Sequence, residues 1–301
     1  MFKQTIRTNI ITMFLLLLSF VSFSLIYTQY YFNYNLAVQT TTKTFKLVGE
    51  NILDEIKKRN DKLENLLHAN IFNASFQKKI SFNTTNPAAH DLIRMLSVNP
   101  GLYAMYFAQK DGSFYEVINM QESDLLYTYF QAPKETRWLI LTSIGEKTQY
   151  TYLDKFHKII QSTFSTRKSK ALSRPWYKKA VASKKLLITE PYLFEGLQEM
   201  GTSYVLQTTQ KGTVFGIDYS MQSINKFLQI QNFNANSEIF LFNKDGRKLV
   251  SSNPAESKNN ILPYKKISPY LLQAVEENYD DILKYSEENT HYFSLYIPLG
   301  G

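Results

Sequence analysis

The chain contains no cysteine and only four histidines among its 301 residues. Without cysteine, a disulfide framework, a Cys-ligated zinc site and a thiol nucleophile are all excluded. A binuclear metal centre needs several convergent ligands, and the four histidines lie far apart in the sequence. His90-Asp91 is the kind of dipeptide that metal-dependent phosphohydrolases use, but we interpret it here as a surface pair that opens a helix. The sequence therefore predicts no metal site.

Motifs of catalysis and nucleotide binding are also absent. The sequence has neither a G-x-x-x-x-G-K-[ST] phosphate loop nor a G-x-S-x-G nucleophile turn. The paired acids Asp280-Asp281 and Glu287-Glu288 lie in polar stretches that are typical of solvated surface. We expect no catalytic residues and no cofactor in these 301 residues.

The formal net charge is +8, from 34 Lys and Arg against 26 Asp and Glu. The basic residues occur mostly as scattered lysine pairs. A nucleic-acid-binding protein more often carries a basic stripe together with a recognition motif, and we find neither. The charge indicates a solvated, lysine-rich surface, and we expect no nucleic-acid partner.

No charged residue occurs between Arg7 and Lys43, and residues 10–27 are almost entirely apolar. Such a stretch is long enough to cross the hydrocarbon core of a membrane as a helix. Lys3 and Arg7 precede it, so the positive-inside rule places the N-terminus in the cytoplasm. The alternative is a cleaved signal peptide, but the run is long for one. Aromatic residues typical of the membrane interface follow it: Tyr27, Tyr30, Tyr31 and Tyr34.

Residues 36–71 change to a repeat of apolar residues every three or four positions, with charged residues between them. This pattern predicts a long amphipathic helix, with Gly49 as its weakest point. Its apolar stripe could pack against the protein's own globular part or against a second copy in a parallel homodimer. Both possibilities stay open at this point.

The next segment has the pattern of an antiparallel sheet with short helices. Lys110-Asp111-Gly112 predicts a hairpin turn, in which glycine can adopt a positive φ. We expect strands at residues 102–108, 114–118, 137–141, 156–164, 186–189, 203–209 and 213–218, and helices at 91–97, 175–183 and 221–229.

A second turn of the same type, Lys244-Asp245-Gly246, indicates a faint repeat that begins near residue 237. A helix at residues 269–277 and a strand at 292–297 would continue this second module. A further strand should follow, so we expect that the chain is a fragment cut inside the module.

Side chains suited to binding a small ligand are concentrated in the stretch from Arg174-Pro175-Trp176-Tyr177 to Glu190-Pro191-Tyr192. A guanidinium group binds a carboxylate, and aromatic side chains attract a cation or an apolar body. Asp218, in an apolar run, could provide the counter-charge for a bound amine. The alternative interpretation is that the aromatic residues belong to the core and Arg174 to a surface ion pair.

The order of these parts resembles a double Cache sensor domain, the periplasmic part of many bacterial transmembrane receptors. The Arg-Pro-Trp-Tyr segment, the Pro-Tyr pair and Gly216-Ile217-Asp218 carry the resemblance. It implies an α+β fold with an N-terminal transmembrane helix, a long helix and two PAS-like antiparallel-sheet modules, the second incomplete. The expected segments are residues 1–34 (cytoplasmic tip and transmembrane helix), 35–75 (long helix), 76–232 (membrane-distal module) and 233–301 (membrane-proximal module).

The resemblance also implies a ligand site. In the amino-acid-binding subgroup of the family, the positions that match Arg174, Trp176, Tyr177, Tyr192 and Asp218 bind the ligand. The Arg side of that pattern holds the carboxylate, and the Asp holds the ammonium group. The subgroup has a Tyr five residues before the Arg, where this chain has Ser169. The ligand therefore stays open between an amino acid, an amine and another small carboxylate.

Receptors of this type lie in the bacterial inner membrane, with the sensor in the periplasm and an output domain in the cytoplasm. The segments of this chain are most similar to sensors that precede HD-GYP cyclic-di-GMP phosphodiesterases. Nucleotide cyclases, histidine kinases and chemotaxis transducers are the next expected outputs. The alternative is a membrane-anchored enzyme or structural protein with no role in ligand sensing.

Overall fold

The computed structural model describes residues 6–82, 87–166, 170–183, 185–232, 234–243, 245–253, 267–277, 283–287 and 290–298. They fall into two compact units, which we describe separately. One unit combines Met1–Asp54 with Pro269–Gly301, and the other is Glu55–Ser268.

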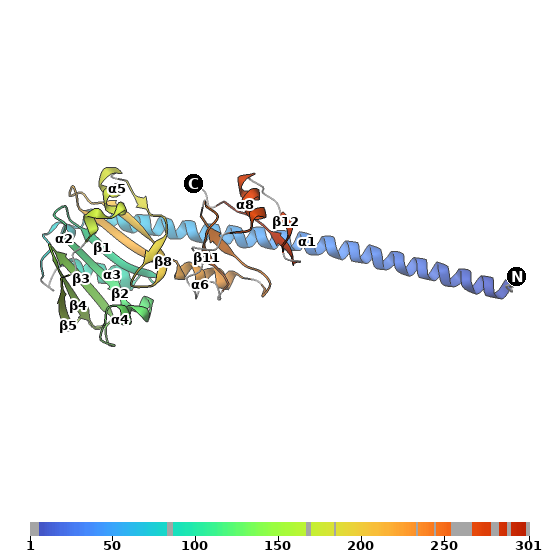
Figure 1. Ribbon diagram of the computed structural model, residues 1–301, viewed down its shortest axis with the longest axis horizontal. Helices are drawn as coiled ribbons and strands as arrows, with labels where there is room; N and C mark the ends of the chain where they lie inside the picture. Colours follow the sequence, from blue (N-terminus) through green and yellow to red (C-terminus); the bar gives the residue numbers. More distant parts are fainter. Residues whose placement is uncertain are drawn as a thin grey trace. The chain divides into compact units, whose positions relative to one another are not determined.

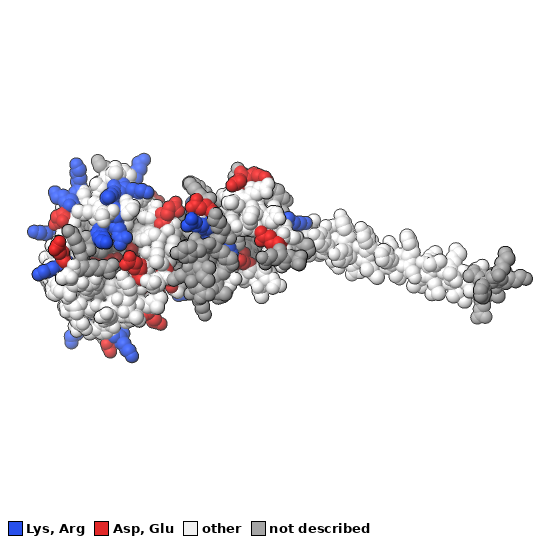
Figure 2. Space-filling model, in the orientation of Figure 1, with Lys and Arg blue, Asp and Glu red and all other residues white. Residues whose placement is uncertain are grey.

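The predicted transmembrane helix and the predicted long amphipathic helix form a single continuous helix, α1 (Ile6–Asn70). The side chains along its apolar first part are exposed, and this part carries no charge in the surface view (Figure 2). Among the described helices, α1 alone is long and apolar enough to cross a membrane. The sequence joins the two segments because no proline and no run of turn-forming residues separates them.

The larger unit is built on an antiparallel sheet with the strand order β5-β4-β3-β2-β1-β9-β8-β6, and β7 also pairs with β8 (Figure 1). A separate pair, β10 and β11, lies in the same unit. The strands are β1 (Leu102–Ala108), β2 (Phe114–Asn119), β3 (Trp138–Ile144), β4 (Lys147–Leu153), β5 (Ile159–Ser165), β6 (Leu187–Ile188), β7 (Tyr192–Phe194), β8 (Glu199–Gln207), β9 (Val214–Ser220), β10 (Phe240–Phe242) and β11 (Lys248–Ser251). The helices of this unit, besides the end of α1, are α2 (Ala74–Gln77), α3 (Pro87–Ser97), α4 (Leu125–Tyr129), α5 (Pro175–Ser183) and α6 (Gln222–Gln231), with 3-10 turns at Met120–Glu122 and Ala171–Ser173.

One face of this sheet packs against helices. The Phe76 ring of α2 stacks between Phe107 of β1 and Phe215 of β9, with ring centroids 5.1 and 4.7 Å apart. All three side chains are fully buried. The end of α1 contributes Leu63 and Leu67 to the core, with exposed fractions of 3% and 0%.

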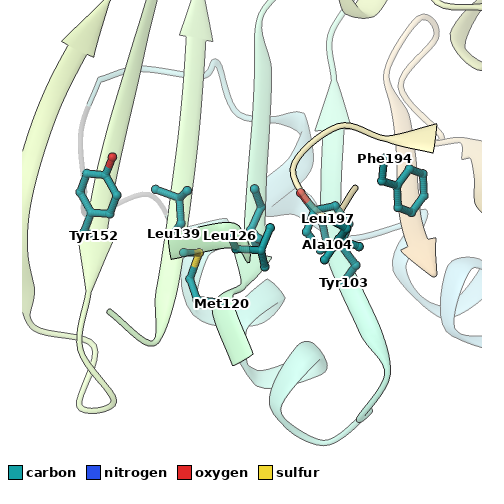
Figure 3. Close-up of a cluster of buried hydrophobic side chains, with 9 residues drawn as sticks. Tyr103, Ala104, Met120, Leu126, Leu139, Tyr152, Phe194 and Leu197 are labelled. Carbon is teal, nitrogen blue, oxygen red and sulfur yellow. The ribbon is translucent and has the colours of Figure 1, made fainter. Parts of the chain in front are cut away.

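The opposite face carries a second buried cluster around Tyr103, Leu139 and Tyr152 (Figure 3). Met120 and Leu126, which follow β2 in the chain, belong to the same cluster and are labelled in Figure 3. Because successive strand residues point to opposite faces, every second residue of β1 to β4 is available on this side.

The smaller unit consists of the first part of α1, helix α8 (Pro269–Glu276) and the hairpin of β12 (Leu283–Glu287) and β13 (Thr290–Ser294). Tyr285 stacks on Tyr270 and Tyr292, with ring centroids 5.4 and 5.1 Å apart. Gly49 of α1 has a packing role, because a Cβ atom there would lie 1.9 Å from the Cδ1 atom of Ile297. The glycine that weakens the helix therefore makes room for this side chain.

The α+β class is confirmed, with a long apolar N-terminal helix followed by antiparallel sheet modules. Both predicted glycine turns exist, with Gly112 at φ 88° and Gly246 at φ 71°. Lys244 of the second turn lies outside the described residues.

The sequence reading was wrong about several elements. It did not predict β4 (Lys147–Leu153), whose alternating residues are Thr, Gln and Tyr rather than aliphatic. It also missed α4, β7 and β12. Strand β5 begins later than predicted, because the Asp154 side chain accepts hydrogen bonds from the backbone N–H groups of Phe156 and Lys158 and forms a turn there.

Candidate ligand-binding site

The Arg-Pro-Trp-Tyr segment folds as the start of α5. Pro175 occupies the first turn of the helix, where its missing N–H group costs nothing and its fixed φ suits the helix. Arg174 precedes it in an extended conformation and is exposed. Trp176 then points to the sheet, where its ring centroid lies 5.1 Å from that of Tyr106.

A cavity of about 740 Å³ lies between this segment and the sheet. Its volume falls in the range of roughly 300–1,000 Å³ that is typical of small-molecule sites. The walls come from β1 to β4, β7, β9 and residues 170–176. Part of the buried cluster in Figure 3 forms one wall, through Tyr103, Ile118 and Phe194.

Four of the five predicted site residues line this cavity: Arg174, Trp176, Tyr192 and Asp218. Tyr177 is not among the lining residues. Its hydroxyl donates a hydrogen bond to the backbone oxygen of Gly212 at 2.7 Å, and its ring packs in the core under α5. Ser169, which stands at the position of the missing Tyr, lies outside the described residues.

Asp218 is the buried carboxylate of the cavity, with an exposed fraction of 7%. The Ser203 hydroxyl on the neighbouring strand β8 donates a hydrogen bond to its Oδ1 atom at 2.5 Å. The Tyr192 and Ser203 hydroxyl oxygens are 2.7 Å apart. Because Ser203 has one proton and gives it to Asp218, Tyr192 must be the donor to Ser203. A chain from Tyr192 through Ser203 thus fixes the orientation of the carboxylate.

Burial raises the pKa of Asp218 from its usual 3.8 to about 7. The hydrogen bond from Ser203, the nearby Tyr106 hydroxyl and the positive charge of Arg174 lower this pKa, but the cost of desolvating the charged form is larger. Burial and the nearby Asp218 charge also raise the pKa of Tyr192, so this phenol stays protonated at neutral pH. The site therefore contains a carboxylate that titrates near neutrality and that gains stability from a bound cation.

The rim of the cavity is positively charged. Lys170 and Arg174 line it and are exposed. Lys178 and Lys179 of α5 are exposed as well, and Figure 2 shows Lys and Arg side chains around the part of the surface that α5 covers. A carboxylate group of a ligand would find its counter-charge at this rim, while an amine would find Asp218 inside.

The sequence reading missed several lining residues, in particular Tyr106 of β1 and Glu116 of β2. The available signal was the alternation of side chains along β2, which places Phe114, Glu116 and Ile118 on the same face. That signal does not say which face of the strand lines a cavity, so only the fold could identify these residues.

No group of three or more His, Asp or Glu side chains that could hold a metal occurs in the described part of the chain. The His90-Asp91 pair has a structural explanation. Asp91 accepts hydrogen bonds from the Asn73 side-chain amide at 3.0 Å and the Ser75 hydroxyl at 3.4 Å, and so joins α2 to α3, while His90 is exposed.

Comparison with solved structures gives the class of the fold. The ligand-binding domain of the Campylobacter jejuni chemoreceptor Tlp3, in complex with 4-methylisoleucine, superposes with a TM-score of 0.54 and 16% identity over 86% of this chain and 84% of that one. The same domain in complex with L-valine gives a TM-score of 0.53, with 16% identity over 86% of each chain. The chain therefore has the fold of a chemoreceptor sensory domain, and the double Cache resemblance is confirmed.

No protein-family model matches the chain. Among curated proteins, the methyl-accepting chemotaxis protein PctB of Pseudomonas aeruginosa is 27% identical over 130 residues. The match covers 40% of this chain and 20% of PctB, so it spans about a fifth of that protein's length. None of these comparisons supports an HD-GYP phosphodiesterase, because the receptors that they name are chemoreceptors.

Proposed function

We propose that the chain is the sensor region of a bacterial transmembrane receptor and that the cavity above β1 and β9 binds a small molecule carrying an amine. The observation that carries the proposal is the buried Asp218, which Ser203 and Tyr192 hold in place inside a cavity with a cationic rim. A buried carboxylate with a raised pKa is costly to the free protein and is stabilised when a cation binds.

An amino acid is one candidate ligand, because its carboxylate would meet Arg174 while its ammonium group meets Asp218. The Tlp3 domain with the same fold was solved with isoleucine, valine and related amino acids bound. The fold is shared at low identity, and Ser169 departs from the amino-acid-binding pattern, so simple amines and other small organic acids stay in the candidate set.

We further propose that α1 anchors the receptor in the inner membrane, with its N-terminus in the cytoplasm and the sheet modules outside. The apolar, exposed first part of α1 supports an anchor, and Lys3 and Arg7 support the orientation. The lipid bilayer is then one partner, and a second copy of the chain, packed along α1, is another.

We propose chemotaxis signalling as the output of the whole receptor, because the curated relative is a methyl-accepting chemotaxis protein. Ligand binding would act through the end of α1, which packs on the sheet that carries the cavity. A ligand shifts such an equilibrium only by binding one conformation more tightly than the other.

The test is a binding screen of the full chain in nanodiscs against amino acids, amines and carboxylates, read by thermal shift and by tryptophan fluorescence. The chain has two tryptophans, and one of them, Trp176, lines the cavity. We expect at least one amine-bearing compound to raise the melting temperature, and this effect to disappear in Trp176→Ala and Asp218→Ala. Asp245→Asn, at an exposed turn, is the control. A ligand that binds equally well to both folded cavity variants would exclude this site.

A further inference from the structure

The hydroxyl of Tyr106, on the central strand β1, is fully buried beside Ser203 and Asp218, but it makes no hydrogen bond of ordinary length to any described residue. The Tyr106 side chain is 2% exposed and lines the cavity. Leaving a buried hydroxyl without a hydrogen bond destabilises a folded protein, so such a group calls for an explanation. A ligand in the cavity would supply the missing partner.

The position of Tyr106 is fixed by its neighbours on both sides. Its backbone pairs with Gly216 of β9 and with Glu116 of β2. A Cβ atom at Gly216 would lie 2.4 Å from the Tyr106 ring, so the glycine lets this ring lie over β9. Asp218 is two residues further along β9 and on the same face, and the Tyr106 hydroxyl lies close enough to lower its pKa.

A second acidic side chain, Glu116, lies on the other side of Tyr106 and lines the same cavity. It is half-buried, in contrast to the exposed cations at the rim. Glu116 and Asp218 lie on the two strands that flank β1, two strand spacings apart, and they are offset by two residues along the strand direction. Their Cα atoms are therefore roughly 12 Å apart, from the usual dimensions of a sheet. The cavity thus has one carboxylate from each of the two strands that flank β1.

The space between the two carboxylates has aromatic walls. The centroids of the Trp176 and Phe114 rings lie 5.1 and 5.5 Å from that of Tyr106. Aromatic faces attract cations and also accommodate an alkyl chain. A negative group at each end and an apolar middle are complementary to two ammonium groups joined by a short alkyl chain.

We propose that the cavity selects small molecules with two positively charged nitrogens, one bound by Asp218 and the Tyr106 hydroxyl and the other by Glu116. This inference rests on the proposed function, because it specifies the ligand class of the same cavity. Two sources share the chemistry: a diamine, and an amino acid with a basic side chain. The rim residues Lys170 and Arg174 would contact the carboxylate of the amino acid alone.

The first experiment compares four compounds by isothermal titration calorimetry with the full chain in nanodiscs. Cadaverine and lysine carry two ammonium groups, whereas pentylamine and norleucine lack the second one. We expect each dication to bind at least about tenfold more tightly than its monocationic partner, from the usual strength of one charge-assisted hydrogen bond. Tighter binding of lysine than of cadaverine would identify the amino acid as the source, and the reverse would identify the diamine.

The second experiment uses variants that remove one group each. Glu116→Gln should weaken cadaverine and lysine binding about tenfold or more and leave pentylamine and norleucine within about twofold. Glu146→Gln, in the exposed turn between β3 and β4, is the matched control. These variants change only a charge at a position that is not fully buried, so we expect both to fold.

A pair of tyrosines tests the hydroxyl. Tyr106 and Tyr115 are both buried with unpaired hydroxyls among the described residues, but Tyr115 lies on the helix-covered face of the sheet. Its ring centroid is 5.4 Å from that of Phe107 there. Tyr106→Phe should weaken all four amines about fivefold to tenfold, whereas Tyr115→Phe should leave their affinities unchanged.

The outcomes separate the two proposals. If pentylamine and norleucine bind as tightly as cadaverine and lysine, and Glu116→Gln has no selective effect, the dication inference fails while the amine-binding function stands. If none of the four compounds binds but another amine does, the inference also fails alone. If no amine binds at all, both fail. The comparison of the four compounds on the unmodified chain needs no variant, so it holds even if a variant misfolds.

Discussion

The hydroxyl of Tyr204 donates a hydrogen bond to the Oδ1 atom of Asn60 at 2.5 Å and joins strand β8 to helix α1. The residue before it, Ser203, donates to Asp218 in the cavity on the opposite face of the sheet. Successive strand residues point to opposite faces, so one peptide bond separates the cavity contact from the helix contact. The same alternation on β9 places Tyr219 under the guanidinium of Arg59, with 5.2 Å between the Cζ atom and the ring centroid.

We predict that Tyr204→Phe reduces the response of α1 to ligand and has little effect on ligand binding. The variant removes the hydroxyl that joins β8 to Asn60, and it leaves the cavity side of the strand unchanged. Hydrogen–deuterium exchange of residues 55–70 measures the response. We expect ligand to protect these amides in the unmodified protein and much less in the variant, with affinity within about twofold and stability lower by about 1 kcal/mol.

An equal change of exchange in both proteins would show that the signal does not pass through this contact. Tyr115→Phe, which removes a hydroxyl from the same face of the sheet without breaking a hydrogen bond to α1, is the control.

Asp218→Asn should stabilise the ligand-free protein while it abolishes amine binding. The pKa of Asp218 is raised by burial to about 7, so ionisation of this group destabilises the folded state above pH 7. Removing the charge should raise the free energy of unfolding by about 2 to 4 kcal/mol at pH 8, from about 1.4 kcal/mol per unit of pKa shift. Thermal melting at pH 8 and pH 4 measures the difference.

The sign of this effect follows from the direction of the shift. A carboxyl group with a raised pKa binds more protons in the folded state, so its destabilising effect is complete above pH 7 and disappears as the pH falls towards 4. The two melting curves should therefore converge at pH 4. A variant that is less stable than the unmodified protein at pH 8 would contradict the conclusion that burial of this carboxylate costs the free protein more than its hydrogen bond to Ser203 returns.

Amine binding should strengthen as the pH rises from 5.5 to 7.5. The ligand binds the ionised form of Asp218, whose pKa in the free protein is raised by burial to about 7. Below that pH the group must lose a proton first, so affinity should fall by up to about tenfold per pH unit. The charged and titratable groups that act on Asp218 are Arg174 and three tyrosines, namely Tyr103, Tyr106 and Tyr192, and Glu116 lines the same cavity.

Calorimetry in two buffers of different ionisation enthalpy checks this directly. Binding at pH 7 should release about half a proton, because about half of the Asp218 groups are protonated before ligand binds. A flat affinity profile without proton release would mean that Asp218 does not contact the cation.

Tyr177 and Tyr192 should respond differently to the same substitution. Tyr177 donates to the backbone oxygen of Gly212, outside the cavity, so Tyr177→Phe should cost about 1 kcal/mol of stability and leave affinity unchanged. Tyr192→Phe breaks the chain to Ser203 and Asp218, so it should weaken amine binding about tenfold. Melting curves and titrations of both variants distinguish a structural from a ligand-binding tyrosine.

If Tyr177→Phe weakens binding as strongly as Tyr192→Phe, then Tyr177 also belongs to the ligand site. The sequence pattern, which groups both tyrosines as ligand-binding, would then be right and the lining of the cavity incomplete.

The local sequence determined much of this protein. The apolar run without charge before Lys43 specifies a helix suited to a membrane, and the heptad-like repeat after it continues that helix to Asn70. Glycine at the two hairpin turns, and proline at the start of α5, fixed the backbone at those points because each residue has special φ preferences. These features depend on neighbours within a few residues, which is why a sequence reveals them.

The tertiary structure alone decided which side chains meet in the cavity. Strand β4 was not visible as a strand, because its Thr and Tyr residues become buried only when β3 and β5 pair beside it. Tyr177 follows Trp176 directly, yet the helical turn of α5 directs one to the core and the other to the cavity. Glu116 and Asp218 are about a hundred residues apart and share a cavity because β1 pairs with both of their strands. Such contacts follow from the order of strands in the sheet, which no local pattern of residues encodes.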